Sequence, residues 1–471
     1  MNFINTYAAL PERFYETVRP ASPPAPELIA WNRELAHHLG IDPDTDPTRL
    51  AQWFGGDEPM PGARPIALAY AGHQFGHFVP QLGDGRAALL GELRSPVDGK
   101  GYDLQLKGSG PTPFSRRGDG KSSLGPVIRE YLLSEAMHRL GVPTTRSLTA
   151  VRTGESVFRN AKEPGGVLTR VAASHIRVGT FQYFAARKDA EALQRLTDYA
   201  IARHYPHARD ADRPIVAFYG EVVQAQARLI AHWMALGFIH GVMNTDNMAV
   251  SGETLDYGPC AFLDEFHIHK IFSSIDHQGR YAYGNQADMA RWNLARLADC
   301  LLQLDADAPA FEDALTRFDP VFTDDYYARM RARLGLDDAQ PEDADILTAW
   351  LQHLQNQQRD YHQAFVELEE RLRTETMETI EGFTQPWLRR LDEQTGGRQA
   401  ARRRMAAHNP RYLPRNHQVE RAIQSAFQGD YRVFEELRQV LSDPYTEHPG
   451  LEIYKEPPRE EERVSMTFCG T

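Results

Sequence analysis

The sequence predicts an α+β protein of two lobes with an extension at each end. Strand-like alternation broken by glycine turns dominates residues 66–180, and amphipathic helical patterns dominate residues 181–375. A chain of 471 residues is long enough for two or three such units. We therefore expect an N-terminal extension over residues 1–65, the two lobes, and, over residues 376–471, a helical extension that ends in a cysteine-containing tail.

Composition restricts the partners and the compartment. The net charge is −12 and the isoelectric point is about 5.8, so we do not expect nucleic acid as a partner. No run approaches the roughly 20 apolar residues of a membrane span. The first residues lack a basic region followed by an apolar run, so we expect no secretion signal. Three cysteines without a C-x-x-C pair fit a reducing compartment, and we expect a cytoplasmic monomer.

A glycine turn in the first lobe is a candidate phosphate contact. Gly83-Asp-Gly85-Arg86 precedes a strand-like run over residues 87–93. Its glycines would let backbone N–H groups approach an anion, with the arginine close by. Taken alone, these residues are better explained by an ordinary hairpin turn.

A second candidate is the lysine that ends the next strand. Residues 102–107 alternate between apolar and polar types and end at Lys107, and a helix opened by Gly125-Pro126 carries Glu130. A strand lysine that binds nucleotide phosphates and pairs with a helix glutamate is typical of kinases. The alternative is that Glu130 only complements the helix dipole.

The segment between this strand and this helix is rich in glycine and basic residues. Gly120-Lys-Ser suggests a P-loop, but that motif needs glycine at position 115, where this chain has Ser115. A basic flap over phosphates fits better than a true P-loop.

The sequence leaves the roles of two further residue pairs open. His73 and His77 have the i, i+4 spacing of a zinc pair on a helix, but the glycines around them argue for a packed loop. Arg170 and Arg177 are seven apart, so an unbroken strand would point them to opposite faces. A bulge or turn must intervene if both bind one ligand, and otherwise they are surface arginines.

The second lobe is organised around the loop His240-Gly-Val-Met-Asn-Thr-Asp246-Asn247. After a short insert follows Asp256-Tyr-Gly258. Kinases place H-R-D-x-x-x-x-N just before a hairpin and D-F-G. In that register Asn247 matches the metal-binding asparagine, whereas Val242 stands where the catalytic aspartate belongs. The loop therefore looks like a kinase site whose base is missing and whose carboxylate has moved to Asp246.

Helices are predicted before and after this loop in the sequence. Periodicity predicts them over residues 189–202, with Asp189 as N-cap, and over 221–236, 286–304 and 345–376. Cys300 falls at core spacing and is expected to be buried. Cys469, third from the end, is either an accessible redox thiol or a passive terminal cysteine.

The motifs together closely resemble the selenoprotein O family, over most of the chain. They are Gly83-Asp-Gly-Arg86, the run from Leu104 through Lys107 to Asp119-Gly120, Arg129-Glu130-Tyr131, the loop ending in Asp246-Asn247, and Leu255-Asp256-Tyr-Gly-Pro259.

The resemblance implies a protein kinase-like bilobal fold that transfers AMP from ATP, bound in a flipped orientation, to hydroxyl groups of proteins. It implies that Asp246 is the proton acceptor, that Asn247 and Asp256 bind magnesium, and that Glu130 pairs with the lysine. The implied nucleotide contacts are Gly83, Gly85, Arg86, Lys107, Asp119, Gly120, Arg170, Arg177 and Asp256.

The end of the chain departs from the family, which often has two serines after its Cys or selenocysteine, whereas here Gly470-Thr471 follow Cys469. We expect a regulatory redox contact between Cys469 and Cys260.

Other functions stay open. A conventional protein phosphotransferase, a uridylyltransferase that uses UTP or Mn²⁺, and an inactive nucleotide-binding scaffold are the alternatives.

Overall fold

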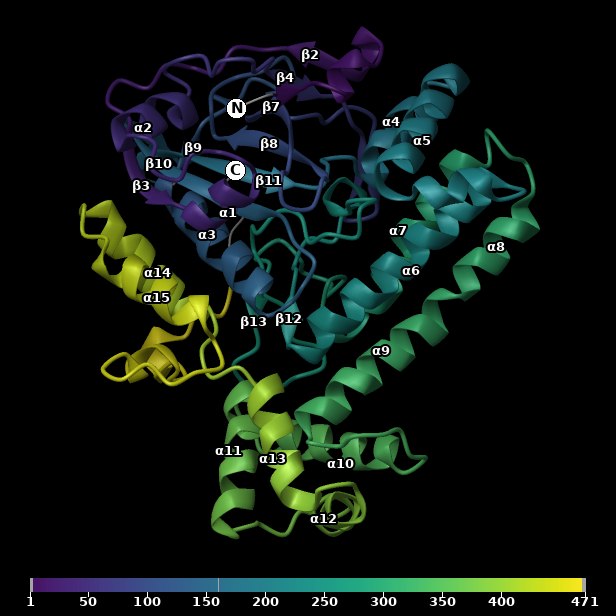
Figure 1. Cartoon of the computed structure of the whole chain (residues 1–471), viewed down its shortest axis with the longest axis vertical. Helices are drawn as coiled ribbons and strands as arrows, with labels where there is room; N and C mark the ends of the chain where they lie inside the picture. Colours follow the sequence, from purple (N-terminus) through teal and green to yellow (C-terminus); the bar gives the residue numbers. More distant parts are fainter. Residues whose placement is uncertain (1–2, 160, 468–471) are drawn as a thin grey trace.

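The computed structural model describes residues 3–159 and 161–467, and its architecture confirms the predicted α+β class. An antiparallel sheet is built by the first 172 residues, and most of the remaining chain is helical (Figure 1). The division into four segments stays a prediction. None of the helices in the described ranges is long and apolar enough to cross a membrane.

The sheet brings together strands that are far apart in the sequence. The order is β2 (Tyr15–Thr17), β4 (Ile66–Leu68), β7 (Ala87–Arg94), β8 (Gly101–Lys107), β11 (Lys162–Ala172), β10 (Arg146–Phe158) and β3 (Glu27–Trp31), with β1 (Phe3–Ile4) on β7 and β9 (Ser122–Ser123) on β11. Three of these strands come from residues 3–31, which the sequence placed in an extension. Two short helices, α1 (Arg33–His38) and α2 (Pro47–Gly55), follow them.

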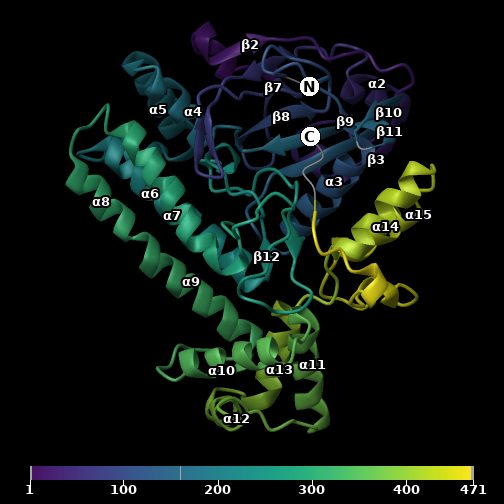
Figure 2. The same cartoon turned by 180° about the vertical axis from the view of Figure 1, so that it is seen from behind.

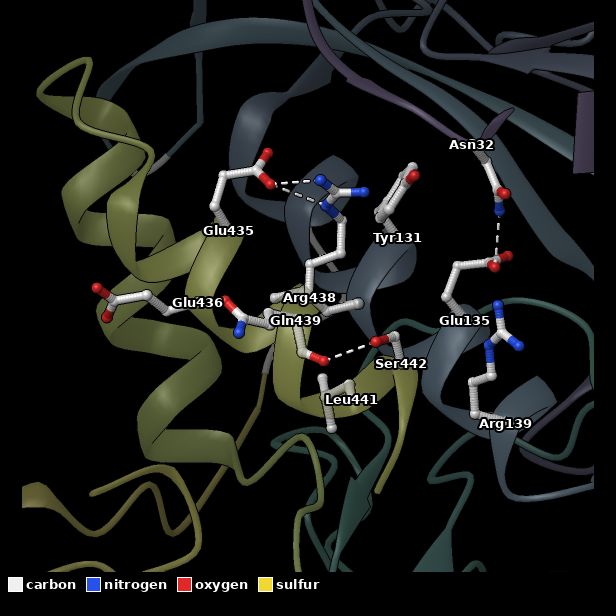
Figure 3. Close-up of a pocket in the computed structure, with 11 residues that line it drawn as sticks. Asn32, Tyr131, Glu135, Arg139, Glu435, Glu436, Arg438, Gln439, Leu441 and Ser442 are labelled. Carbon is white, nitrogen blue, oxygen red and sulfur yellow. Dashed lines mark hydrogen bonds and ion pairs between the residues drawn. The ribbon is translucent and has the colours of Figure 1, made fainter. Parts of the chain in front are cut away.

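Helix α3 (Leu124–Arg139) links the sheet to the end of the chain. One side packs on β10 and β11, and another contacts α14 (Asn416–Phe427) and α15 (Arg432–Ser442). A cavity of about 460 Å³ lies between α3 and α15 (Figure 3). Its lining includes Tyr131 and Glu135 of α3 and Arg438 of α15.

The helical part is centred on α6 (Pro214–Ala235), which packs against α7, α8 and α9. In Figures 1 and 2, α10–α13 lie at the end of the molecule away from the sheet. The remaining bounds are α4 (Val178–Ala186), α5 (Ala190–His204), α7 (Gln286–Leu301), α8 (Ala308–Thr316), α9 (Phe318–Arg333), α10 (Asp343–Asn356), α11 (Tyr361–Thr374), α12 (Thr384–Glu393) and α13 (Gly397–His408). Asp189 caps α5 by accepting from Ala192 N, as predicted.

One helix prediction was wrong, because residues 345–376 form two helices and not one. Asp360 interrupts the predicted helix because it is the N-cap of α11, where its side chain accepts from His362 N and Gln363 N. Arg415, distant in sequence, binds the same carboxylate at 2.8 and 3.0 Å. The break is therefore fixed by a tertiary ion pair that helical periodicity does not contain.

Candidate active site

Strand register places two cations on one face of the sheet. Arg170 of β11 lies opposite Gln105 of β8, and Leu168 lies opposite Lys107. Residues directly opposite each other in an antiparallel pair share a face, as do residues two apart on one strand. The side chains of Lys107 and Arg170 therefore project to the same side.

Two carboxylates meet these cations. Glu130 of α3 accepts from Lys107 Nζ at 2.7 Å and from Arg170 Nε at 2.7 Å. Asp256 Oδ1 accepts from Arg170 Nη2 at 2.7 Å and also from Lys107. Glu130 and Arg170 are almost fully buried, with side chains 3 % and 2 % exposed. We call these four residues the charge cluster.

The cluster holds its carboxylates in the ionised form. Burial acts to raise the pKa of Asp256, but the neighbouring Lys107 and Arg170 outweigh it and keep that pKa well below its usual value. Burial also acts to raise the pKa of Glu130, but Arg170 and Lys107 outweigh it and lower that pKa. Two carboxylates and two cations balance each other inside the protein.

A turn resolves the spacing of Arg170 and Arg177. Strand β11 ends at Ala172, and Arg177 is the N-cap of α4, so the chain changes direction between the two arginines. The guanidinium of Arg177 lies 4.3 Å from the ring centre of Tyr70 and 3.8 Å from Asp84. Arg177 thus reaches the glycine turn, whereas Arg170 is connected to it through Gln105, which donates to Asp84 at 3.1 Å.

Side chains from other elements fix this turn. His175 donates from its backbone N and from Nδ1 to Asp103, at 3.1 and 3.2 Å. Ala173 N donates to Glu253 at 3.0 Å, and Arg203 Nε donates to Ala173 O at 2.7 Å. The sequence did not point to these residues, since their partners are 30 to 80 positions away.

The flap folds onto the glycine turn. Gly83 has φ +79°, and a Cβ there would overlap the ring of Phe114, while a Cβ at Gly85 would lie 2.9 Å from Phe114 O. The hydroxyl of Ser115, which stands where a P-loop needs glycine, donates to Gly85 O. Next in the chain, Arg86 O accepts from the N–H of Gly108 at 2.7 Å, which places it beside the end of β8.

Asp119 and Gly120 lie at the base of the flap and not in the charge cluster. Asp119 forms a bidentate pair with Arg159, at 3.0 and 3.1 Å. Gly120 O accepts from Gly110 N at 3.0 Å, and a Cβ at Gly120 would overlap Gly110 O.

His240 joins the two loops of the second candidate lobe. Its Nε2 lies 3.0 Å from Leu255 O, and its Nδ1 accepts from Val242 N at 3.4 Å. Burial lowers its pKa, so the ring is neutral, and these partners assign the proton to Nε2. The ring also stacks on Trp233 with centroids 5.3 Å apart. The loop that carries Asp246 is thereby tied to the segment that carries Asp256.

Asp246 is a buried carboxylate, 7 % exposed. Its Oδ2 accepts from Gln74 Nε2 at 3.3 Å, and within the described ranges no hydrogen-bond donor reaches Oδ1. Burial raises the pKa of Asp246 to about 6, with Arg177 opposing the shift. Beside it, Asn247 donates from Nδ2 to Val242 O at 3.0 Å, so its side-chain oxygen is the atom suited to a cation.

His73 and His77 are not on a helix. They lie on β5 (Gly72–Gln74) and β6 (His77–Val79), which form a hairpin. His73 Nδ1 accepts from Gln182 Nε2 at 2.7 Å. In the part of the chain that the structure describes, no three His, Cys, Asp or Glu side chains gather as a metal-binding cluster. The segment is therefore a hairpin in which His73 is hydrogen-bonded, and not the helix that an i, i+4 zinc pair requires.

Comparison with known proteins identifies the family. The family described as "Protein adenylyltransferase SelO" matches residues 1–442. The chain belongs to the SelO family. It is 50% identical to "Protein nucleotidyltransferase YdiU" of Rhodopseudomonas palustris (strain BisB18) over 100% of this chain and 99% of the relative. Proteins of the same name from Agrobacterium fabrum and Nitrobacter hamburgensis are 49% and 51% identical, over 100% of this chain and 100% and 96% of the relatives. Membership assigns the enzyme class, a nucleotidyltransferase that modifies proteins.

Two of the three cysteines of this SelO protein lie in the described part of the chain. Cys260 and Cys300 are buried, Cys300 as predicted. Cys469 lies outside the described residues. Thr467, the last described residue, donates from Oγ1 to Pro259 O, directly before Cys260, and from its N–H to Phe272 O at 2.7 Å.

Four residues that hold the loop of residues 240–247 in place were not predicted from the sequence: Gln74, Gln182, Thr245 and Tyr281. Thr245 accepts from His73 N and donates to Gln182, each at 2.6 Å, and Tyr281 donates to Asn244 Oδ1 at 2.7 Å. Thr245 lies within the predicted loop motif but had no role assigned to it, and Gln74 lies beside His73. Gln182 and Tyr281 are ordinary polar residues without a motif.

Proposed function

We propose that the protein transfers AMP from ATP to Ser, Thr or Tyr hydroxyls of other proteins on a kinase-like bilobal fold. One observation carries the proposal beyond family membership. One loop contributes Asp256 to the charge cluster, whose Lys107 and Arg170 could bind phosphates, and the other loop carries Asp246, a buried carboxylate with one oxygen that no donor reaches among the described residues. His240 couples the two loops.

The charge cluster supports nucleotide binding. Lys107 and Arg170 reach Asp256 from neighbouring strands, and Arg177 is close to the glycine turn. ATP phosphates would compete with Glu130 and Asp256 for these cations. In the flipped orientation that we propose for ATP, the α-phosphate faces the acceptor. The proposed nucleotide contacts are Gly83, Gly85, Arg86, Lys107, Asp119, Gly120, Arg170, Arg177 and Asp256.

The oxygens of Asn247 and Asp256 fit a magnesium ion. Asp256 is ionised, and its bonds to Lys107 and Arg170 both end on Oδ1, so Oδ2 takes part in neither bond. The amide of Asn247 is oriented by its bond to Val242 O. Mg²⁺ prefers a few oxygen ligands from the protein and takes the others from water and phosphates, and Mn²⁺ accepts the same ligands. When bound, the ion would neutralise charge on the phosphates.

Asp246 is the proposed proton acceptor. The acceptor oxygen attacks the α-phosphorus, the bond from that phosphorus to the bridging oxygen breaks, and pyrophosphate leaves. The hydroxyl proton moves to Asp246. A raised pKa near 6 makes this carboxylate a better base than an ordinary aspartate while it stays mostly ionised at neutral pH.

Labelled ATP tests this function. Incubation with ATP labelled at the α-phosphate should label protein, and the label should be lost in Asp246→Ala and Asp256→Ala. Label transferred from the γ-phosphate instead would mean phosphorylation, and preferential transfer from α-labelled UTP or only with Mn²⁺ would mean uridylylation. Equal labelling by wild type and Asp256→Ala would refute both enzymatic assignments.

We further propose that the activity is linked to redox homeostasis through the tail. The proposal is supported by two bonds from Thr467, the last described residue, to Pro259 O and Phe272 O, near Cys260. Oxidation that joined Cys469 and Cys260 would hold the tail there. Transfer rates of wild type and Cys469→Ser should then differ in their response to oxidant and reductant, and an identical response would refute the link.

A further inference from the structure

The β5–β6 hairpin lies directly on the loop that carries Asp246. Three consecutive hairpin residues bind three consecutive loop residues. His73 N donates to Thr245 Oγ1 at 2.6 Å, Gln74 Nε2 to Asp246 Oδ2 at 3.3 Å, and Phe75 N to Asn244 Oδ1 at 3.0 Å. These three bonds hold the loop against the hairpin.

The tip of the hairpin is anchored by an aromatic residue in an unfavourable conformation. Phe75 has φ +50° and Gly76 has φ +84°, as in a two-residue turn that normally prefers Asn-Gly. The ring of Phe75 packs on Tyr281 at 5.1 Å, and the Tyr281 hydroxyl donates to Asn244 at 2.7 Å. A bulky residue in this region is strained, and such strain concentrates at functional sites. The contact with Tyr281 compensates for it and fixes the tip.

The two oxygens of Asp246 have different surroundings. Gln74 donates to Oδ2, whereas Oδ1 is buried and receives no hydrogen bond from the described residues. Gly72 covers Oδ1 so closely that a Cβ at residue 72 would lie 2.5 Å from it. A buried acceptor without a donor is unfavourable, so this oxygen is suited to a donor that arrives with the substrate.

We propose that Gln74 is a positioning residue of the transfer reaction, which holds Oδ2 of Asp246 so that Oδ1 meets the acceptor hydroxyl. The inference rests on the proposed role of Asp246 as proton acceptor. Gly72 contributes no side chain, so a small shift of the hairpin exposes Oδ1. The three rotatable bonds of Gln74 let its amide stay on Oδ2 during that shift.

Replacement of Gln74 by leucine tests the proposal. Gln74→Leu keeps the volume and removes the donor, and His77→Leu is the matched control, because His77 is the cross-strand partner of Gln74 and is exposed. The full-length proteins are compared for transfer from α-labelled ATP to casein and to their own hydroxyls. ATP affinity and Tm are measured in parallel.

We expect kcat of Gln74→Leu to fall about tenfold (about 1.4 kcal/mol) with ATP affinity unchanged and Tm lowered by no more than about 3 °C, since a hydrogen bond to a buried charged group is lost. Gln74→Glu, which cannot donate when ionised, should lose at least as much, and His77→Leu should match wild type. An unchanged kcat in Gln74→Leu would overturn the inference. A fall of kcat together with weaker ATP binding, or with a fall in Tm of more than about 3 °C, would also overturn it, because Gln74 would then act by stabilising the hairpin and not by positioning Asp246. If wild type itself transfers no α-label, the proposed function fails and not this inference alone.

Discussion

Replacing Glu130 with glutamine tests the charge balance of the cluster. In the wild type, Glu130 and Asp256 balance Lys107 and Arg170, and Glu130→Gln leaves the cluster with a net positive charge. The side chain of Arg170 is only 2 % exposed, so water cannot replace the lost carboxylate. Removal of one partner from a buried ion pair costs about 3–5 kcal/mol. Because glutamine keeps one carbonyl acceptor and Asp256 remains, we expect the low end, about 3 kcal/mol.

Thermal unfolding with and without ATP measures this effect. The unfolding entropy of a chain of this length predicts a fall of about 1 °C per kcal/mol, so the Tm of Glu130→Gln should drop by about 3 °C without nucleotide. ATP should then raise Tm more than in wild type, because the phosphates no longer compete with Glu130 for Lys107. The control is Glu191→Gln, whose carboxylate is 64 % exposed in surface ion pairs and should change stability by less than about 0.5 kcal/mol. An unchanged Tm in Glu130→Gln, or a smaller shift with ATP, would refute the reasoning.

Three further predictions concern other parts of the site. Burial raises the pKa of Glu253 to about 7 from 4.5, so its contribution to stability is complete below pH 4.5 and is lost as the pH rises through 7. Glu253→Gln should therefore gain about 2 kcal/mol relative to wild type between pH 5 and pH 8, measured as Tm against pH, and a parallel pH dependence of the two proteins would contradict this. Gly83→Ala should weaken ATP binding about tenfold (about 1.4 kcal/mol), because a Cβ would overlap Phe114 and φ is +79°, and a Phe114→Ala background should restore part of the loss. Chelation of divalent metal should abolish α-label transfer and added Mg²⁺ should restore it, whereas transfer that persists in excess EDTA would exclude the proposed role of Asn247.

Local sequence patterns were sufficient to predict the elements on which the candidate site is built. The strand that ends at Lys107, the helix that carries Glu130 and the loop before Asp256 all appear where periodicity and turn residues placed them. These features depend on residues close together in the chain. The odd spacing of Arg170 and Arg177 indicated that a turn must separate them if both bind one ligand. The residues that anchor this turn, Asp103 and Glu253 among them, could not be predicted.

The features that were missed depend on distant contacts. Strands β1, β2 and β3 are short, and their partners are β7, β4 and β10, so nothing local marks them as part of the sheet. The break between α10 and α11 depends on Arg415, and the hold on Asp246 depends on Gln74, 172 positions earlier. A single polar residue at such a separation has no periodicity or motif from which to infer its partner.

The structure also gives a physical reason for the position of the carboxylate in the loop. Val242, at the position of the kinase base, is buried, and its backbone is fully used: its N–H donates to His240 and its carbonyl accepts from Asn247. An ionised side chain buried at that position would need a cation to offset its desolvation. Asp246 is also buried, but Arg177 acts against the rise in its pKa, and Gln74 donates to one of its oxygens. The carboxylate of the loop therefore stands where the hairpin and Arg177 can support it.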